Sequence, residues 1–290
     1  MSMNDINIDN VNIGTESKKP ILFSHKKTST DIRDQSFHLH DDLEIYVYVS
    51  GDVDFIIGDS YKTLKCGDIL FTFPNELHKP VIKSDKEYER FFITVPVDVF
   101  DSFDLCEKSP IDCFTTAKHT DVRAIELDDE ERSNFLRILT KISECISDGD
   151  ENRYLAYSYF LRALYILNTA KSISLPADTN LPPVLRDVLA YISENFADLS
   201  TVSEIAKHFH VNSSYLSSLF SKYMKVGIKQ YLQYKKISGA KTMLAGGASV
   251  TEVCFDCGFN SCSHFISVFK EATGMTPNKY RSLNSSQGEI

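Results

Sequence analysis

The sequence predicts an α+β protein with an antiparallel β-barrel first, two helices after it, and an all-helical domain at the end. Three observations support this prediction. Short segments rich in β-branched and aromatic residues follow one another between residues 21 and 127. After residue 127 the apolar residues recur at helical spacing. The last hundred residues contain an internal repeat of helical segments with a period of 48 to 49 residues.

The strand-like segments of the front half are separated by turn-forming residues. Glycine or proline stands between them at Gly51, Gly58, Gly67 and Pro74. Closely spaced short strands of this kind are typical of an antiparallel barrel or jelly roll, which we place at residues 21–127. The polar stretch before it, residues 1–20, is expected to be a flexible arm. The strand-like segments are 45–49, 55–57, 69–73 and 91–95.

Two helices are expected after the barrel. Phe135, Leu139, Ile142 and Ile146 lie on one face of the first. The second, from about residue 154 to 170, is apolar nearly all round, which predicts burial or a subunit interface. We assign residues 128–170 to a helical dimerisation segment and residues 171–183, which end in two prolines, to a linker.

Composition favours an intracellular protein with two functionally different halves. The apolar and charged fractions, 42% and 24%, are those of an ordinary globular chain, and no signal peptide or membrane segment is evident. The 7 cysteines lack a disulfide-framework spacing, so we expect reduced thiols and a cytoplasmic location. Residues 184–290 hold 11 Lys and Arg against 8 Asp and Glu, whereas the rest of the chain is strongly acidic and the whole carries −9. This asymmetry suggests different partners for the two halves.

Each unit of the C-terminal repeat reads as a short helix, a tight turn and a longer amphipathic helix. Thr201 and Glu204 form a capping-box pattern before the first short helix. Asn212 and Ser261 are placed to cap the two longer helices. Gly258 stands where the second turn needs a residue without a Cβ atom. The pattern predicts two helix-turn-helix units, joined by a helix from Ile228 to about Ala245.

Residues 184–283 resemble the DNA-binding domain of the AraC/XylS family of transcription regulators, with residues 284–290 as a tail. The positions in register with the family signature are Gly258, Phe259, Phe265, Phe269, Lys270, Gly274, Pro277, Tyr280 and Arg281. The first unit and the connecting helix match through Ala206, Leu216, Phe220, Tyr231, Ala240 and Leu244. The resemblance implies double-stranded DNA as partner, a homodimer, and contact with RNA polymerase if the protein is an activator.

By this resemblance, two recognition helices enter successive major grooves. The positions that face bases are Ser213, Ser214, Ser217 and Ser218 in the first and Cys262, Ser263, Ile266 and Ser267 in the second. The phosphate contacts are expected from Lys222, Lys225, Lys229, Lys270 and Lys279. Lys225 replaces a usual glycine, which puts the geometry of that turn in question. The Cys254/Cys257 pair lacks a second pair at zinc spacing, so we expect both thiols to be packed in the core.

The front half carries two segments that resemble the motifs of cupin barrels. The first runs from His38 through His40 to Glu44, and the second reaches from Gly67 to His78. In metal-binding cupins such residues hold an ion, so the ligands, if any, are His38, His40, Glu44 and His78. The second motif lacks its usual glycine after the proline and its distal asparagine, and we expect no metal, no cofactor and no catalytic residues.

The favoured interpretation is a pocket for a small-molecule effector. Its candidate residues are His38, His40, Glu44, Tyr46, Tyr48, His78 and Arg90. By resemblance, the effector is a sugar or oligosaccharide. We therefore expect a sequence-specific, effector-controlled transcription regulator and not an enzyme. Two alternatives stay open: a metal-dependent cupin enzyme fused to a DNA-binding module, and a ligand-independent regulator whose barrel, filled by its own aromatic residues, serves dimerisation.

Overall fold

The computed structural model describes residues 7–13, 20–28, 37–58, 60–99, 110–114, 122–174 and 181–284. Two antiparallel sheets build the N-terminal domain. The larger has the strand order β1-β2-β8-β3-β6-β9-β10 and the smaller the order β5-β4-β7. The strands are β1 (Asn7–Asn12), β2 (Leu22–Thr28), β3 (Leu43–Ser50), β4 (Val53–Ile57), β5 (Ser60–Thr63), β6 (Ile69–Thr72), β7 (His78–Ile82), β8 (Tyr88–Val95), β9 (Val122–Glu126) and β10 (Lys171–Ser174).

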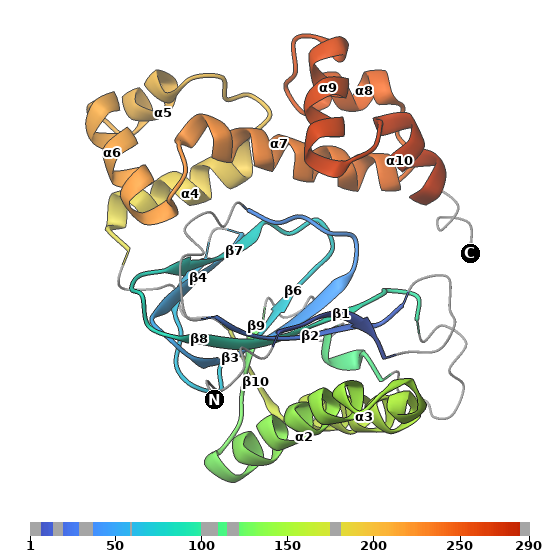
Figure 1. Cartoon of the computed structure of the whole chain (residues 1–290). Helices are drawn as coiled ribbons and strands as arrows, with labels where there is room; N and C mark the ends of the chain where they lie inside the picture. Colours follow the sequence, from blue (N-terminus) through green and yellow to red (C-terminus); the bar gives the residue numbers. More distant parts are fainter. Residues whose placement is uncertain are drawn as a thin grey trace.

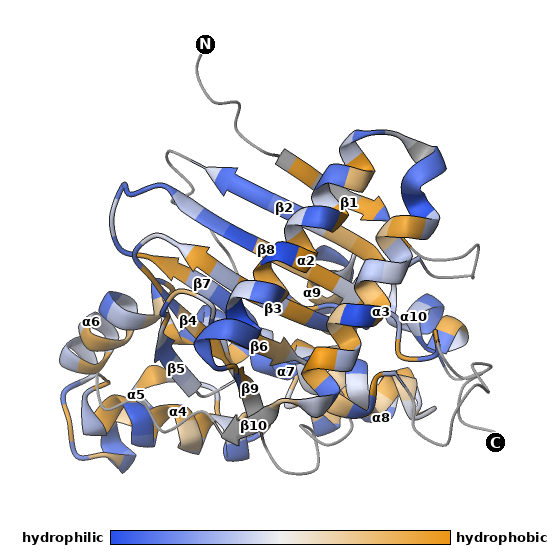
Figure 2. Ribbon diagram, turned by 90° about the horizontal axis from the view of Figure 1, so that it is seen from below, coloured by the Kyte–Doolittle hydropathy of each residue, from blue (hydrophilic) through white to orange (hydrophobic). Residues whose placement is uncertain are grey.

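The two faces of the larger sheet serve different cores, because side chains alternate along each strand. Ile45 and Val47 of β3 pack toward the helices α2 (Asp129–Ser147) and α3 (Arg153–Thr169). Tyr46 and Tyr48, on the opposite face, pack with Phe55 between the two sheets. Figure 2 shows α2 and α3 lying across the larger sheet. The predicted barrel with two following helices is thus confirmed.

Within residues 181–284, the described part of the C-terminal domain, there are seven helices: α4 (Pro183–Asn195), α5 (Val202–His208), α6 (Ser213–Met224), α7 (Ile228–Ala245), α8 (Val250–Asp256), α9 (Cys262–Thr273) and α10 (Pro277–Asn284). The α5–α6 pair and the α8–α9 pair are the two units of the repeat, and α7 connects them (Figure 1). This domain lies against the smaller sheet, on the side of the barrel opposite α2 and α3.

Two parts of the predicted domain plan are wrong in detail. Asn7–Asn12, placed in a flexible arm, forms strand β1 and pairs with β2. Lys171–Ser174, placed in the linker, forms β10 and extends the sheet beyond β9. Both segments are polar edge strands, and their backbone pairing leaves little trace in the apolar pattern by which strands are recognised.

Candidate nucleic-acid interface and effector site

Local sequence positions α6 and α9, the two helices for which base contacts are predicted. The side chain of Asn212 accepts a hydrogen bond from the backbone N–H of Ser214 at 2.8 Å, and Ser261 Oγ accepts one from His264 at 3.4 Å. The capping box of Thr201 and Glu204 before α5 is present as predicted. Four helices of this domain, α5, α6, α8 and α9, therefore begin directly after a residue whose side chain caps the first turn.

Two turns of this domain, one between α8 and α9 and one between α6 and α7, bear on expectations from the sequence. Gly258 has a φ of +72°, and a Cβ atom there would lie 1.8 Å from the carbonyl oxygen of Ala197. Lys225, which follows α6 where the family usually has glycine, adopts the left-handed conformation at φ +54°. The turn geometry is thus retained, at a conformational cost of about 1–2 kcal/mol for a residue with a side chain.

The positions predicted to face DNA bases lie on α6 and α9 and differ in exposure. Ser214, Ser218, Ser263, Ile266 and Ser267 are exposed, whereas Ser213, Ser217 and Cys262 are half-buried. The five lysines Lys222, Lys225, Lys229, Lys270 and Lys279 are all exposed. The sequence reasoning did not select Tyr215, which is 52% exposed on α6. Tyr215 lies outside the apolar stripe of α6, and this position in the sequence could have indicated that its side chain is exposed. Cys254 and Cys257 are buried, as predicted.

The predicted effector residues separate into two groups. Tyr46 lies inside the barrel, where its hydroxyl hydrogen-bonds that of Tyr88. The guanidinium of Arg90 lies 4.2 Å from the ring centroid of Tyr88. Tyr48 is also buried there, with its ring 6.3 Å from that of Tyr88. Tyr88, which sequence reasoning missed, thus organises the interior, and these aromatic side chains fill much of the space between the sheets.

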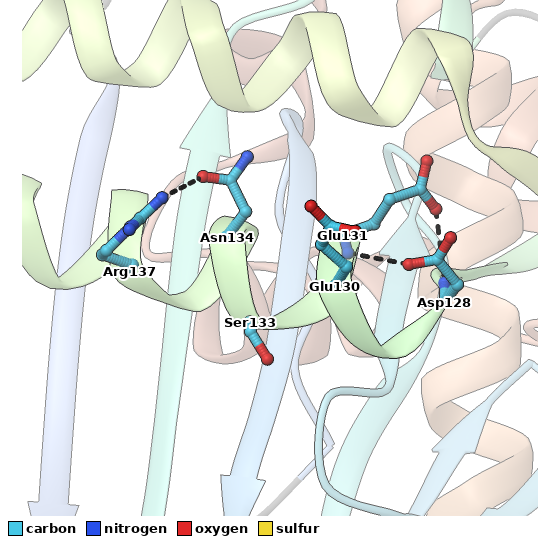
Figure 3. Close-up of a pocket in the computed structure, with 6 residues that line it drawn as sticks. All are labelled: Asp128, Glu130, Glu131, Ser133, Asn134 and Arg137. Carbon is cyan, nitrogen blue, oxygen red and sulfur yellow. Dashed lines mark hydrogen bonds between the residues drawn. The ribbon is translucent and has the colours of Figure 1, made fainter.

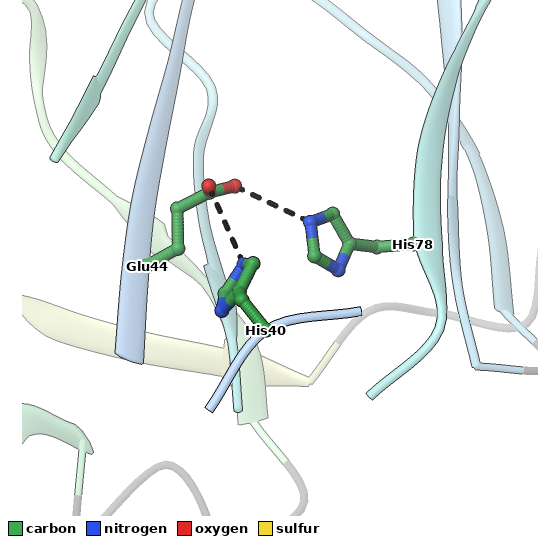
Figure 4. A group of neighbouring side chains, drawn as sticks. All are labelled: His40, Glu44 and His78. Carbon is green, nitrogen blue, oxygen red and sulfur yellow. Dashed lines mark ion pairs between the residues drawn. The ribbon is translucent and has the colours of Figure 1, made fainter. Parts of the chain in front are cut away.

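The second group is the cluster of His40, Glu44 and His78 at the end of the barrel (Figure 4). Glu44 is the second residue of β3 and His78 is the first residue of β7, and their side chains are almost fully buried. One carboxylate oxygen of Glu44 lies 3.5 Å from Nε2 of His40, and the other lies 3.6 Å from Nε2 of His78. His38 is exposed, and its ring centroid lies 5.9 Å from that of His78, outside this cluster.

Burial and the neighbouring charges shift the pKa of each of the three side chains. Burial alone would raise the pKa of Glu44, but the neighbouring histidines hold it below its ordinary value. Burial alone would lower the pKa of His40, but the Glu44 carboxylate raises it. Burial dominates at His78 and lowers its pKa to about 4. At neutral pH, His78 is therefore a neutral imidazole beside a carboxylate.

The chemistry of this donor set fits a divalent transition metal, because imidazole nitrogen and carboxylate oxygen are suitable ligands. His40 and His78 each hydrogen-bond a backbone carbonyl through Nδ1, at 2.8 and 2.9 Å, which leaves Nε2 directed at Glu44. The three potential ligand atoms lie within 4.8 Å of one another. The expected four-residue set is reduced to three, since His38 lies apart.

A cavity of about 390 Å³ opens beside His40, between the barrel and the second helix-turn-helix unit. Leu22, Leu39 and Asp41 line it from the barrel, and Lys241, Met275 and Tyr280 from the C-terminal domain. A larger hollow of about 800 Å³ runs along α2 (Figure 3). Its carboxylates already serve the helix cap, since Asp128 accepts from the Glu131 N–H at 2.8 Å. The cavity between the domains is thus the stronger candidate for a ligand.

Comparison with known proteins agrees with this architecture. The chain matches the family described as AraC-like ligand binding domain over residues 28–164 and the helix-turn-helix domain family over residues 205–282. The chain belongs to the AraC family. It is a DNA-binding transcription regulator with a ligand-binding domain, and since the matched families and the named relatives are regulators, the enzyme alternative is set aside.

Among the relatives is the melibiose operon regulatory protein of Escherichia coli, 23% identical over 254 residues, or 85% of this chain and 83% of the relative. The arabinose operon regulatory protein of Salmonella typhimurium is 28% identical over 164 residues, or 53% of this chain and 55% of the relative. Among solved structures, ToxT of Vibrio cholerae is 12% identical, with a TM-score of 0.37 over 92% of this chain and all of that one. No helix in the described parts of the regulator has the length and apolar character of a membrane span.

Proposed function

We propose that the N-terminal domain of this cytoplasmic regulator binds a sugar or oligosaccharide, and that binding changes how the protein engages DNA. The observation that carries the proposal is the convergence of His40, Glu44 and His78 beside a cavity lined by both domains. Carboxylate and imidazole groups exchange hydrogen bonds with sugar hydroxyls, and the apolar residues Leu39 and Met275 suit the C–H face of a sugar ring. Two relatives regulate a melibiose and an arabinose operon, which supports this effector class.

On the DNA side, we propose base contacts from the predicted positions on α6 and α9 and phosphate contacts from the five exposed lysines. Serine lacks the two-pronged hydrogen-bonding geometry by which Arg or Gln reads a base pair, which is worth about 1–3 kcal/mol per contact. Specificity therefore draws on DNA shape and on a second subunit. For that second subunit, α3 offers Tyr154 and Tyr165, which are 86% and 69% exposed.

The test uses the full-length protein and a DNA duplex selected from a random pool. Melibiose and L-arabinose are the first sugars to titrate, followed by a panel of di- and trisaccharides, with mannitol as control. We expect one sugar to raise the melting temperature and to change the Kd for the duplex. Glu44→Gln should abolish both effects. If the duplex binds well but the whole panel changes neither quantity, the sugar proposal is wrong.

One observation favours a second candidate, a regulator that needs no ligand. Tyr46, Tyr48, Phe55 and Tyr88 fill the barrel interior, as that alternative predicts. The same experiment separates the two candidates, because a ligand-independent regulator binds its duplex with the same Kd throughout the panel.

A further inference from the structure

The chain before β3 has two faces with different partners. Its backbone is held to the barrel, since the N–H of His38 donates to the carbonyl of His78 at 3.0 Å. The N–H of Asn75 donates to the carbonyl of His40 at 2.8 Å. His40 then projects its ring into the cluster with Glu44. The neighbouring odd-numbered residues contact the C-terminal domain instead. We call residues 37–41 the bridging segment.

The bridging segment contacts the C-terminal domain along its whole length. At its start, the ring of Phe37 lies 5.4 Å from that of Tyr231 on α7. Leu39, in the middle, packs against the apolar cores of both units. At its end, Asp41 accepts a hydrogen bond from the hydroxyl of Tyr280 at 2.5 Å and pairs with Lys241 Nζ at 2.9 Å. Lys241 is 3% exposed, so this contact is a largely buried ion pair, and removing one partner would be costly.

The cluster on the barrel side of this segment is electrostatically incomplete. Because Nδ1 of both His40 and His78 donates to a backbone carbonyl, Nε2 of each ring is left facing the Glu44 carboxylate. The separations of 3.5 and 3.6 Å are too long for good hydrogen bonds. Nε2 of His40 is buried and makes no hydrogen bond. Two ring nitrogens and a carboxylate therefore converge at separations that a bound cation would bridge.

We propose that His40, Glu44 and His78 bind a divalent transition-metal ion, and that the ion, by fixing His40, holds Asp41 against α7 and α10 of the C-terminal domain. The backbone carbonyls that orient the two imidazoles are the supports that metal-binding histidines need. Three protein ligands leave coordination positions open, so ion and sugar are compatible. The metal site does not rest on the sugar proposal.

The test for binding is titration of the full-length protein with Co²⁺ and Ni²⁺, followed by calorimetry and by the visible spectrum of bound Co²⁺. We expect one ion per chain, and an affinity loss above about 100-fold in Glu44→Gln, which removes a ligand but keeps the shape. His264→Gln, at an exposed histidine outside the cluster, should bind normally. Circular dichroism establishes that each variant is folded. His40→Gln removes a second ligand at a position that is less buried than Glu44, and it should also weaken metal binding.

The test for coupling is hydrogen exchange in α10, which carries Tyr280. Co²⁺ should slow exchange there by at least about fivefold in the wild type. Asp41→Asn should keep the metal affinity but lose this protection, which a purely local metal site would not predict. Binding without any change in α10 would overturn the coupling. Absence of binding, or thiolate-to-cobalt bands that show ligation by cysteines, would overturn the metal site. A sugar response in a protein that binds no metal would leave the proposed function standing.

Discussion

Gly258→Ala is expected to destabilise the second helix-turn-helix unit severely. The substitution forces a side chain into a left-handed turn at φ +72°, which costs about 1–2 kcal/mol. Its Cβ atom would also lie 1.8 Å from the Ala197 carbonyl oxygen and 2.8 Å from Nζ of Lys236. Lys236 donates a hydrogen bond to the Gly258 carbonyl at 2.8 Å, so the backbone cannot move away without losing it. Relief of such overpacking adds about 1–3 kcal/mol.

Gly274→Ala is the matched control for this prediction. Gly274 follows α9 with nearly the same φ, +74°, but no heavy atom lies within 4 Å of the position of its Cβ. It should therefore show the conformational cost alone, about 1–2 kcal/mol. Urea unfolding of both variants, with the wild type alongside, measures the difference. If both substitutions lower the free energy of unfolding equally, the clash with Ala197 does not exist in solution and the packing on this turn of the segment that follows α4 is wrong.

Three further predictions test the turn, the barrel and the outer helices. Lys225→Gly should raise the free energy of unfolding by about 0.5–1 kcal/mol, because glycine relieves the left-handed strain. It should also reduce the salt dependence of DNA binding by the amount expected for the loss of about one phosphate contact. Burial lowers the pKa of His25 although Glu89 raises it, so the unfolded chain takes up the proton first. Stability should fall as pH drops below about 6.5, and less steeply in His25→Gln, as pH-dependent urea unfolding would show. Replacing Tyr154 and Leu155 by Ser should leave stability within about 0.5 kcal/mol and weaken the dimer in sedimentation; a wild type that sediments as a monomer would contradict this.

The DNA-binding half could be predicted closely because its determinants are local. Asn212 caps α6 and Gly258 makes a left-handed turn, and both follow from one residue and its neighbours. The effector site could be predicted only in part. The cupin-like motifs correctly predicted that His40, Glu44 and His78 lie together. They did not predict that His38 lies apart from them. Nothing local signals that Tyr88 closes the barrel interior or that Asp41 reaches Lys241, since these contacts join residues 42 to 200 positions apart.

The apolar contact between the domains limits how far this regulator can be treated as two interchangeable modules. Phe37, Ile56 and Leu77 of the barrel share one core with Leu185 and Tyr231 of the DNA-binding domain. A chimera that joins this barrel to the DNA-binding domain of a relative would expose those side chains unless the receiving helices offer the same face. To change promoter specificity, one should therefore alter the exposed surfaces of α6 and α9. The residues of α7 that pack on the barrel, such as Tyr231, should be kept.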